Sequence, residues 1–145
     1  MKNGIAFAHT EQEIAACYPV MAELRPHLDA ETFVPLVQHL TAVTNFQLAY
    51  LADDGIKAVA GIRISEWLAR GKYLEIEDLV ATSSKRSHGY GSKLFDWIVA
   101  YAQANACTQV RLVSRLSRTA AHRFYLRKGM QIEAHYFSMS LGNED

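Results

Sequence analysis

The second half of the chain alternates between strand-like and helix-like segments, and this alternation most narrows the folds open to it. Apolar spacing predicts strand, helix, strand, helix and strand over Tyr73–Ala81, Gly89–Asn105, Gln109–Ser114, Thr119–Lys128 and Ile132–Leu141. Strands separated by a helix usually lie parallel in one sheet, because the helix carries the chain back to the starting end. We therefore expect a partly parallel sheet covered by helices.

The first half predicts two helices followed by a hairpin. Helices are expected over Thr10–Leu24 and Asp29–Val43, and strands over Phe46–Leu51 and Ala58–Ser65, with a short extra strand near Ile5–Ala8. Thr10 and Glu13 form a capping-box pattern at the first helix. The run Asp53-Asp54-Gly55 suits the turn of the hairpin. Together the two halves predict a mixed α/β (α+β) class.

Length and composition favour a single domain over residues 1–145. The chain has 145 residues and half of them are apolar, enough for one buried core but not for two. It has no apolar run near the roughly 20 residues that span a bilayer, and no signal-peptide pattern. Cys17 and Cys107 lie far apart without metal-ligand spacing. We expect a cytoplasmic protein without a membrane partner, disulfide framework or metal.

Charge is balanced in total but uneven along the chain. Residues 1–84 carry six basic and eleven acidic side chains, whereas residues 85–128 carry nine basic and one acidic. A basic segment inside a neutral protein indicates either solvated helix faces or a local anionic partner. Zero net charge, and bases interrupted by the apolar positions of two helices, argue against nucleic acid as that partner.

The stretch from Leu79 to Ser92 is the most informative for chemistry. It ends a strand, turns, and opens a helix, with Lys85 and Arg86 before a pair of glycines, Gly89 and Gly91. Free backbone N–H groups at a helix start, together with the helix dipole and two cations, make an anion site of pyrophosphate size. The chain lacks the Gly-Lys-Ser/Thr end of a Walker loop, and Leu94 stands where a dinucleotide fingerprint needs its third glycine.

Two motifs together carry a family resemblance. The first is Arg-x-x-Gly-x-Gly at Arg86, Gly89 and Gly91, and the second is the Ala121–Met130 run that contains Phe124 and Tyr125. One helix and one strand separate them. The first motif resembles the acyl-CoA loop of the Gcn5-related N-acetyltransferases, the GNAT family, and the second resembles a helix that lies further along the chain in that family. The resemblance extends over about residues 73–140.

The resemblance implies a fold and an acetyl-CoA site. It implies a central sheet of about six to seven strands flanked by about four helices, splayed between the fourth and fifth strands, with acetyl-CoA as co-substrate and no metal. The residues that would contact acetyl-CoA are Leu79, Val80, Ala81, Arg86, Ser87, His88, Gly89, Tyr90, Gly91, Ser92 and Arg118. Leu79 and Ala81 would act through their main chain. Arg118 departs from the family, since many members have asparagine there; with Arg115 it could reach the 3′-phosphate or the substrate.

The resemblance also implies catalytic roles. Tyr125 would be the general acid at the departing thiolate, and Glu75 or Glu77 the candidate base for the amine. Strand alternation predicts Glu75, Glu77 and Leu79 on one face of the sheet and Asp78 on the other. His39, His122 and His135 are weaker candidates for the base.

Two functions of different class follow. The first is acetyl transfer from acetyl-CoA to a primary amine, on a small molecule or a protein lysine or N-terminus, by direct attack in a ternary complex. The second is an acyl-CoA-binding regulatory module without turnover, and it would need only the phosphate loop. A homodimer is a further candidate assembly. Residues that could contact the acceptor are Arg25, Phe33, Tyr50, Trp67 and Tyr136.

Overall fold

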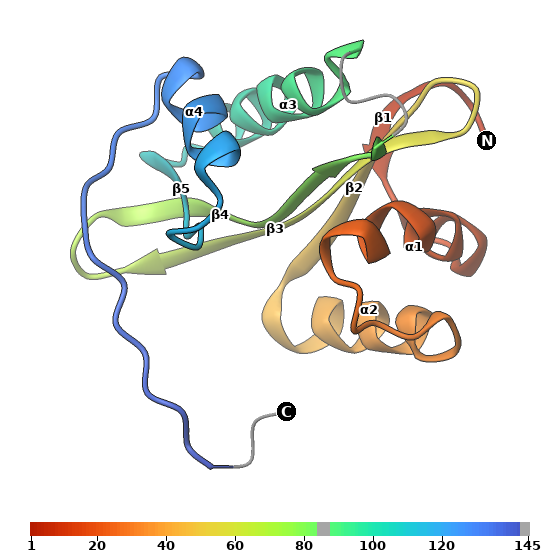
Figure 1. The fold of residues 1–145 in the computed structure, drawn as a ribbon, viewed down its shortest axis with the longest axis horizontal. Helices are drawn as coiled ribbons and strands as arrows, with labels where there is room; N and C mark the ends of the chain where they lie inside the picture. The colour runs from red at the N-terminus through yellow and green to blue at the C-terminus, as the bar shows by residue number, and fades with distance from the viewer. Residues whose placement is uncertain (84–87, 143–145) are drawn as a thin grey trace. The chain divides into compact units, whose positions relative to one another are not determined.

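The computed structural model describes residues 1–83 and 88–142. The chain divides into two compact units, Met1–Leu112 and Val113–Asp145. Among these described residues, the first unit contains a sheet with three helices, and the second contains one helix (Figure 1). The elements are β1 (Gly4–Phe7), α1 (Glu11–Leu24), α2 (Ala30–Thr44), β2 (Phe46–Ala52), β3 (Ile56–Trp67), β4 (Gly71–Ala81), α3 (Tyr90–Ala104), β5 (Gln109–Leu112) and α4 (Thr119–Arg127).

The sheet is mixed and has the order β1-β2-β3-β4-β5. Neighbours are antiparallel from β1 to β4, whereas β4 and β5 are parallel, with α3 between them in the chain. The α/β class and the partly parallel sheet predicted from sequence are confirmed. The five strands found in the described residues are fewer than the six to seven expected.

Helices cover both faces of the first unit's sheet (Figure 1). The capping box predicted at Thr10 and Glu13 is present and fixes the start of α1. The α1/α2 face of the sheet packs against both helices, and the core there includes Cys17, Phe33, Leu48 and Val59. On the α3 face, Leu94 and Ile98 of α3 are fully buried. The two apolar layers hold the sheet by burying surface from water.

The hairpin between β2 and β3 turns where the sequence predicts it. The Asp53 N–H donates to the Gly55 carbonyl oxygen at 2.8 Å. Asp54 and Gly55 both have positive φ, 57° and 98°, which suits the Asp-Gly pair of a tight hairpin.

The strand predicted over Ile132–Leu141 is wrong. The segment belongs to the second unit, and residues 131–141 take part in no strand pairing within the described chain. Its apolar side chains are exposed, Ile132 at 81% and Phe137 at 87%. Alternating apolar residues favour extended backbone, but a strand also needs a neighbour for its N–H and C=O groups.

β5 is much shorter than β4 and pairs with it along its whole length, so the splay that the resemblance implied stays a prediction. β5 pairs with β4 only from Tyr73 to Ile76. Among the described residues, Asp78 to Val80 of β4 pair with β3, and no pairing with β5 extends to them. The outer edge of this part of β4 is therefore open to pairing with another extended group.

Candidate active site

A β-bulge interrupts β4 where the acidic residues lie. Gly61 of β3 pairs with Asp78, but the next residue, Ile62, pairs with Ile76. Glu77 is thus the extra residue of β4. A bulge leaves its extra residue outside the ladder, bends the strand and redirects side chains.

The bulge corrects one expectation about side-chain direction. Val80 and its β3 partner Val59 belong to the core that packs against α1 and α2. Ile76 is also buried but is not part of that core, although it lies an even number of residues from Val80 and regular alternation would put both on one face. Alternation therefore reverses at Glu77. Asp78 comes to the α1/α2 face with Glu75 and Glu77, and Leu79 moves to the opposite face, the reverse of the prediction for those two residues.

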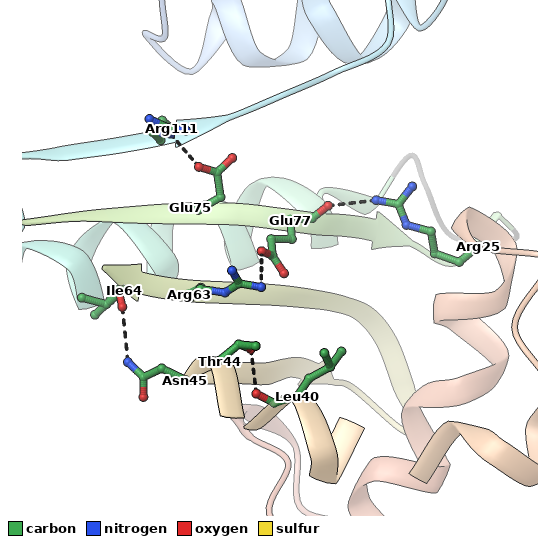
Figure 2. A network of polar contacts seen from close by, with 9 residues as sticks. All are labelled: Arg25, Leu40, Thr44, Asn45, Arg63, Ile64, Glu75, Glu77 and Arg111. Carbon is green, nitrogen blue, oxygen red and sulfur yellow. Dashed lines mark hydrogen bonds and ion pairs between the residues drawn. The ribbon is translucent and has the colours of Figure 1, made fainter. Parts of the chain in front are cut away.

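Arg25, at the end of α1, holds the bulge in place. Its Nε donates to Asp78 Oδ1 at 2.8 Å. Its Nη2 donates to the Glu77 carbonyl oxygen at 2.9 Å (Figure 2). The second bond satisfies the backbone group that the bulge takes out of the ladder. Asp78 needs room across the strand, and Gly61 gives it, because a Cβ at Gly61 would clash with the Asp78 carboxylate and the Phe46 ring.

Glu77 is paired with an arginine of the neighbouring strand. Arg63 of β3 pairs with it at 2.8 Å between Nη2 and Oε2, and both side chains are about one-third exposed (Figure 2). Burial raises the pKa of the Glu77 carboxyl, and although Arg63 opposes this, Asp78 and Glu75 add to the rise. A carboxyl with a raised pKa is a better proton acceptor than an ordinary one.

Glu75 is held more firmly. Arg111 of β5, its partner in the parallel ladder, donates from Nε to Glu75 Oε1 at 2.6 Å (Figure 2). The Arg111 guanidinium also covers two rings, with its carbon 4.4 Å from the centre of Trp67 and 4.7 Å from that of Tyr73. Cation–π contacts of this kind fix the guanidinium in place.

The open edge of β4 presents backbone groups suited to an extended ligand. The Thr82 N–H donates to the Lys57 carbonyl oxygen of β3 at 2.8 Å. In an antiparallel pair, every second residue directs its backbone groups to the partner strand. Val80 therefore faces β3 with its backbone, while Leu79 and Ala81 direct theirs away from β3.

The start of α3 has the geometry of an anion site. Gly89 is the N-cap residue with φ of 76°, a left-handed value that favours glycine. No side chain of the described residues caps this helix, so Tyr90, Gly91 and Ser92 form a first turn without a side-chain cap. His88 lies immediately before it. Arg86 and Ser87, also predicted for this site, fall outside the described residues.

Side-chain hydrogen bonds hold the residues on either side of the connection between β4 and α3. The Tyr90 hydroxyl donates to Asp53 Oδ2 at 2.7 Å, and this bond raises the pKa of the phenol. At the other end, the Glu23 carboxylate accepts bonds from the Thr82 hydroxyl at 3.1 Å and the Ser83 N–H at 2.8 Å. The Tyr90 side chain therefore has a structural partner, and only its backbone is offered to a ligand.

Tyr125 lies on α4 in the second unit. Its ring meets that of Phe124 edge-on, with 5.3 Å between centroids. Burial raises the pKa of the Tyr125 phenol, and the Arg118 charge partly opposes this. Arg118 is the N-cap residue of α4. The phenol is therefore fully protonated at neutral pH, which is the form that a proton donor requires.

The remaining predicted contacts are scattered. Phe33 is a core residue, and Tyr136 is exposed in the second unit. Tyr50 lines a hollow of about 590 Å³ beside β1 and α1, which includes no residue of β4 or α3. Of the five residues proposed for acceptor contacts, Arg25 and Trp67 are those linked to the β4 carboxylates.

The three histidines that are weaker candidates for the base have contacts away from β4 or are exposed. The His122 ring bonds to the Arg115 carbonyl oxygen at 2.8 Å, and the His135 ring contacts Phe137. His39 is exposed on α2. In residues 1–83 and 88–142, no group of three or more His, Cys, Asp or Glu side chains could hold a metal ion. Within the same ranges, no helix is long and apolar enough to cross a membrane.

Sequence reasoning missed Arg63 and Arg111 as partners of the carboxylates. Both are single arginines inside apolar strands, where an unpaired charge would be costly. That position is a signal for a nearby carboxylate. The sequence position alone does not identify which carboxylate pairs with each arginine, because these ion pairs depend on the bulge in β4 and on the register between β4 and β5.

Comparisons with known proteins show the family to which the chain belongs. The family model for the acetyltransferase (GNAT) family matches residues 9–130. The uncharacterized N-acetyltransferase YhdJ from Bacillus subtilis (strain 168) is 36% identical over 130 residues, which cover 88% of this chain and 92% of that protein.

Solved structures share the fold at low sequence identity. A transcriptional regulator from Bacillus halodurans C-125 has a TM-score of 0.84 at 20% identity, covering 97% of this chain and all of that one. The aminoglycoside antibiotic 6′-N-acetyltransferase AAC(6′)-Ih from Acinetobacter baumannii has a TM-score of 0.77 at 16% identity, covering 96% and 99%. With a family model that spans most of the chain and a relative that matches nearly all of it, this protein belongs to the GNAT family of acetyltransferases.

Proposed function

We propose that the protein transfers an acetyl group from acetyl-CoA to a primary amine, with Glu77 as the base. The observation that carries the proposal is the bulge of β4, where a carboxyl with a raised pKa adjoins the open edge of the strand. The start of α3, suited to the pyrophosphate, follows β4 in the chain. The proposed base, the strand edge for the acyl group and the helix start for the pyrophosphate thus follow one another along the chain from β4 to α3.

Glu77 takes this role in preference to Glu75. Both carboxylates are paired with an arginine, but the Glu75 pair is shorter, 2.6 Å against 2.8 Å. Glu75 is also the less exposed of the two side chains, at 17% against 30%. A base must reach the amine proton and accept it, directly or through one water. Glu77 is more accessible, and its raised pKa favours acceptance.

The remaining steps use two further groups. The amine nitrogen attacks the thioester carbonyl carbon and Glu77 takes its proton. The outward N–H of Leu79 is a donor for the negative charge that develops on the carbonyl oxygen, whereas Val80 faces β3. The carbon–sulfur bond breaks, and the Tyr125 hydroxyl supplies a hydrogen bond and then a proton to the thiolate. A raised phenol pKa makes complete transfer uphill, so this hydrogen bond carries most of the effect.

Direct attack suits this chain better than an acyl-cysteine route. Burial raises the pKa of the Cys17 thiol to about 12, and the side chain lies in the core. The pKa of Cys107 is also raised. A thiol must ionise to act as a nucleophile, so both cysteines are poor acyl acceptors.

Initial rates with both substrates varied test this function. Release of free thiol from acetyl-CoA should depend on added amine, and the double-reciprocal lines should intersect, as a ternary complex requires. Parallel lines would instead indicate a covalent acyl-enzyme.

Replacing Gly91 with valine should raise the KM for acetyl-CoA strongly while the protein remains folded. A Cβ at Gly91 would lie 3.9 Å from the Ala81 side chain, an ordinary contact, so the fold tolerates it. The larger side chain would instead obstruct the space above the first turn of α3. Acetyl-CoA affinity and the melting temperature are the measurements. Unchanged affinity in a folded Gly91→Val protein would remove the loop assignment.

Replacing Arg86 with alanine should weaken binding of CoA by about 1–3 kcal/mol, the range for charge-assisted hydrogen bonds. The loss should shrink at high salt, because ions screen the attraction between a cation and the phosphates. Calorimetric titration at two salt concentrations measures both effects. A loss that does not depend on salt would indicate a packing role for Arg86.

Several broader expectations belong to the same proposal. We propose that residues 1–145 act as one N-acetyltransferase domain, which the family match across the boundary between the two units supports. We also propose the cytoplasm as its location and an amine on a small molecule or a protein as its acceptor. Assembly into a homodimer remains a prediction.

A further inference from the structure

We infer that Arg111 recognises a carboxylate on the acceptor, so that the acceptor is an amino-carboxylate rather than a simple amine or a polyamine. The inference rests on the proposed function and specifies its substrate class. It rests on three features of the α1/α2 face of β3, β4 and β5: the geometry of Arg111, the charge balance around Glu77, and the spacing of Glu75 and Glu77 along β4.

Arg111 is fixed in position yet retains donors for a ligand. Its Nε is bonded to Glu75 and its plane covers Trp67 and Tyr73. Among the described residues, no hydrogen bond engages its two terminal NH₂ groups. A guanidinium offers five N–H donors in a rigid fork, and the outer pair matches a carboxylate. The side chain is 34% exposed, and Trp67 beside it is 42% exposed, so a ligand can reach this fork.

The charge balance argues against a polycation. Each of the three β4 carboxylates already has an arginine: Glu75 has Arg111, Glu77 has Arg63 and Asp78 has Arg25. The cluster is neutral when all six groups are charged. A polyamine would meet as many cations as anions here, whereas a molecule with one amine and one carboxylate matches both signs.

The spacing suits one small molecule. Glu75 and Glu77 are two positions apart on β4, roughly 7 Å along a strand. Because Arg111 is bonded to Glu75, a molecule whose amine and carboxylate lie about that far apart would reach from Glu77 to the side of Glu75 where Arg111 lies. The rings of Trp67 and Tyr73, 5.5 Å apart, offer an apolar surface beside that carboxylate.

Matched acceptor pairs that differ only by a carboxylate test this inference. Suitable pairs are γ-aminobutyrate with propylamine, lysine with cadaverine, and phenylalanine with phenethylamine. For the wild type, the acid member of at least one pair should have the higher kcat/KM. In Arg111→Gln, the KM of that acid should rise roughly 10- to 100-fold, as for loss of a charged hydrogen bond. The KM of the matching simple amine should stay within about twofold of its wild-type value or fall, because the Glu75 carboxylate, without Arg111, would attract a cationic amine.

Two further variants separate recognition from structure. Arg111→Lys keeps the charge without the fork and should give an intermediate rise in KM. Arg70→Gln removes a neighbouring exposed cation on the β3–β4 turn and should not change the preference between acid and amine. An equal loss for both members of a pair in Arg111→Gln would overturn the inference, since it would indicate a purely structural pin between β4 and β5.

Binding of the same pairs to the wild type and to Arg111→Gln, measured by calorimetry without acetyl-CoA, gives a readout independent of turnover. Preferential binding of the acid that is lost in Arg111→Gln supports the inference even if no acetyl transfer occurs. Turnover of simple amines with no preference for any acid would overturn it and leave the proposed function intact.

Discussion

Replacing Glu77 with glutamine should lower kcat/KM for the amine roughly 100- to 10,000-fold, the usual contribution of one general base. The amide keeps the shape of the side chain but cannot accept the proton. The free energy of unfolding should fall only modestly. Arg63 loses a charged partner, but the pair is partly exposed, the amide oxygen can still accept its hydrogen bond, and Arg25 keeps the bulge in place through the backbone oxygen at Glu77. Steady-state rates and a thermal melt of the same preparation measure the two effects.

The pH profile distinguishes a base from a positioning group. The ionised carboxylate is the active form, so kcat/KM should fall as pH decreases through the Glu77 pKa. Because burial raises that pKa, the fall should begin at higher pH than for an ordinary carboxyl. Glu77→Gln should lose this limb. Glu66→Gln, the same change at an exposed position of β3, should keep both the rate and the limb. An unchanged limb in Glu77→Gln would assign the base elsewhere.

Replacing Tyr125 with phenylalanine should lower kcat about 10- to 1000-fold, since it deletes the hydroxyl that assists the thiolate. The melting temperature should change little because the ring still packs against Phe124. The KM for acetyl-CoA should also change little. Loss of kcat with KM retained marks an interaction made mainly in the transition state.

A donor with a more acidic leaving thiol should narrow the difference between Tyr125→Phe and the wild type, because its thiolate needs less help. The matched control is Tyr101→Phe, which removes a hydroxyl bonded to Gln47 on the opposite face of β2 from α1 and should leave kcat unchanged. Full kcat in Tyr125→Phe with a lower melting temperature would make Tyr125 a packing residue.

Local patterns predicted the elements well. The capping box at Thr10, the turn at Asp53–Gly55 and the α3 start at Gly89 each depend on neighbours within a few residues. Helical periodicity identified the buried positions Leu94 and Ile98 of α3 for the same reason.

The site depended on information that a single segment does not contain. The bulge at Glu77 exists because β3 and β4 shift register opposite Gly61, so strand alternation assigned Asp78 and Leu79 to the wrong faces. The pairs made by Arg63 and Arg111 depend on the same pairing of strands. The strand predicted over Ile132–Leu141 failed similarly, since periodicity says nothing about whether a partner is present.

Identification of the product tests the central claim most directly. Purified protein should be incubated with acetyl-CoA and a panel of amines and amino-carboxylates, and the mixture analysed by mass spectrometry alongside free thiol. The proposed function predicts one N-acetylated acceptor formed in equal amount to the thiol released, and both lost together in Glu77→Gln. Tight binding of acetyl-CoA without any N-acetylated product would contradict it and favour an acyl-CoA-binding regulatory module.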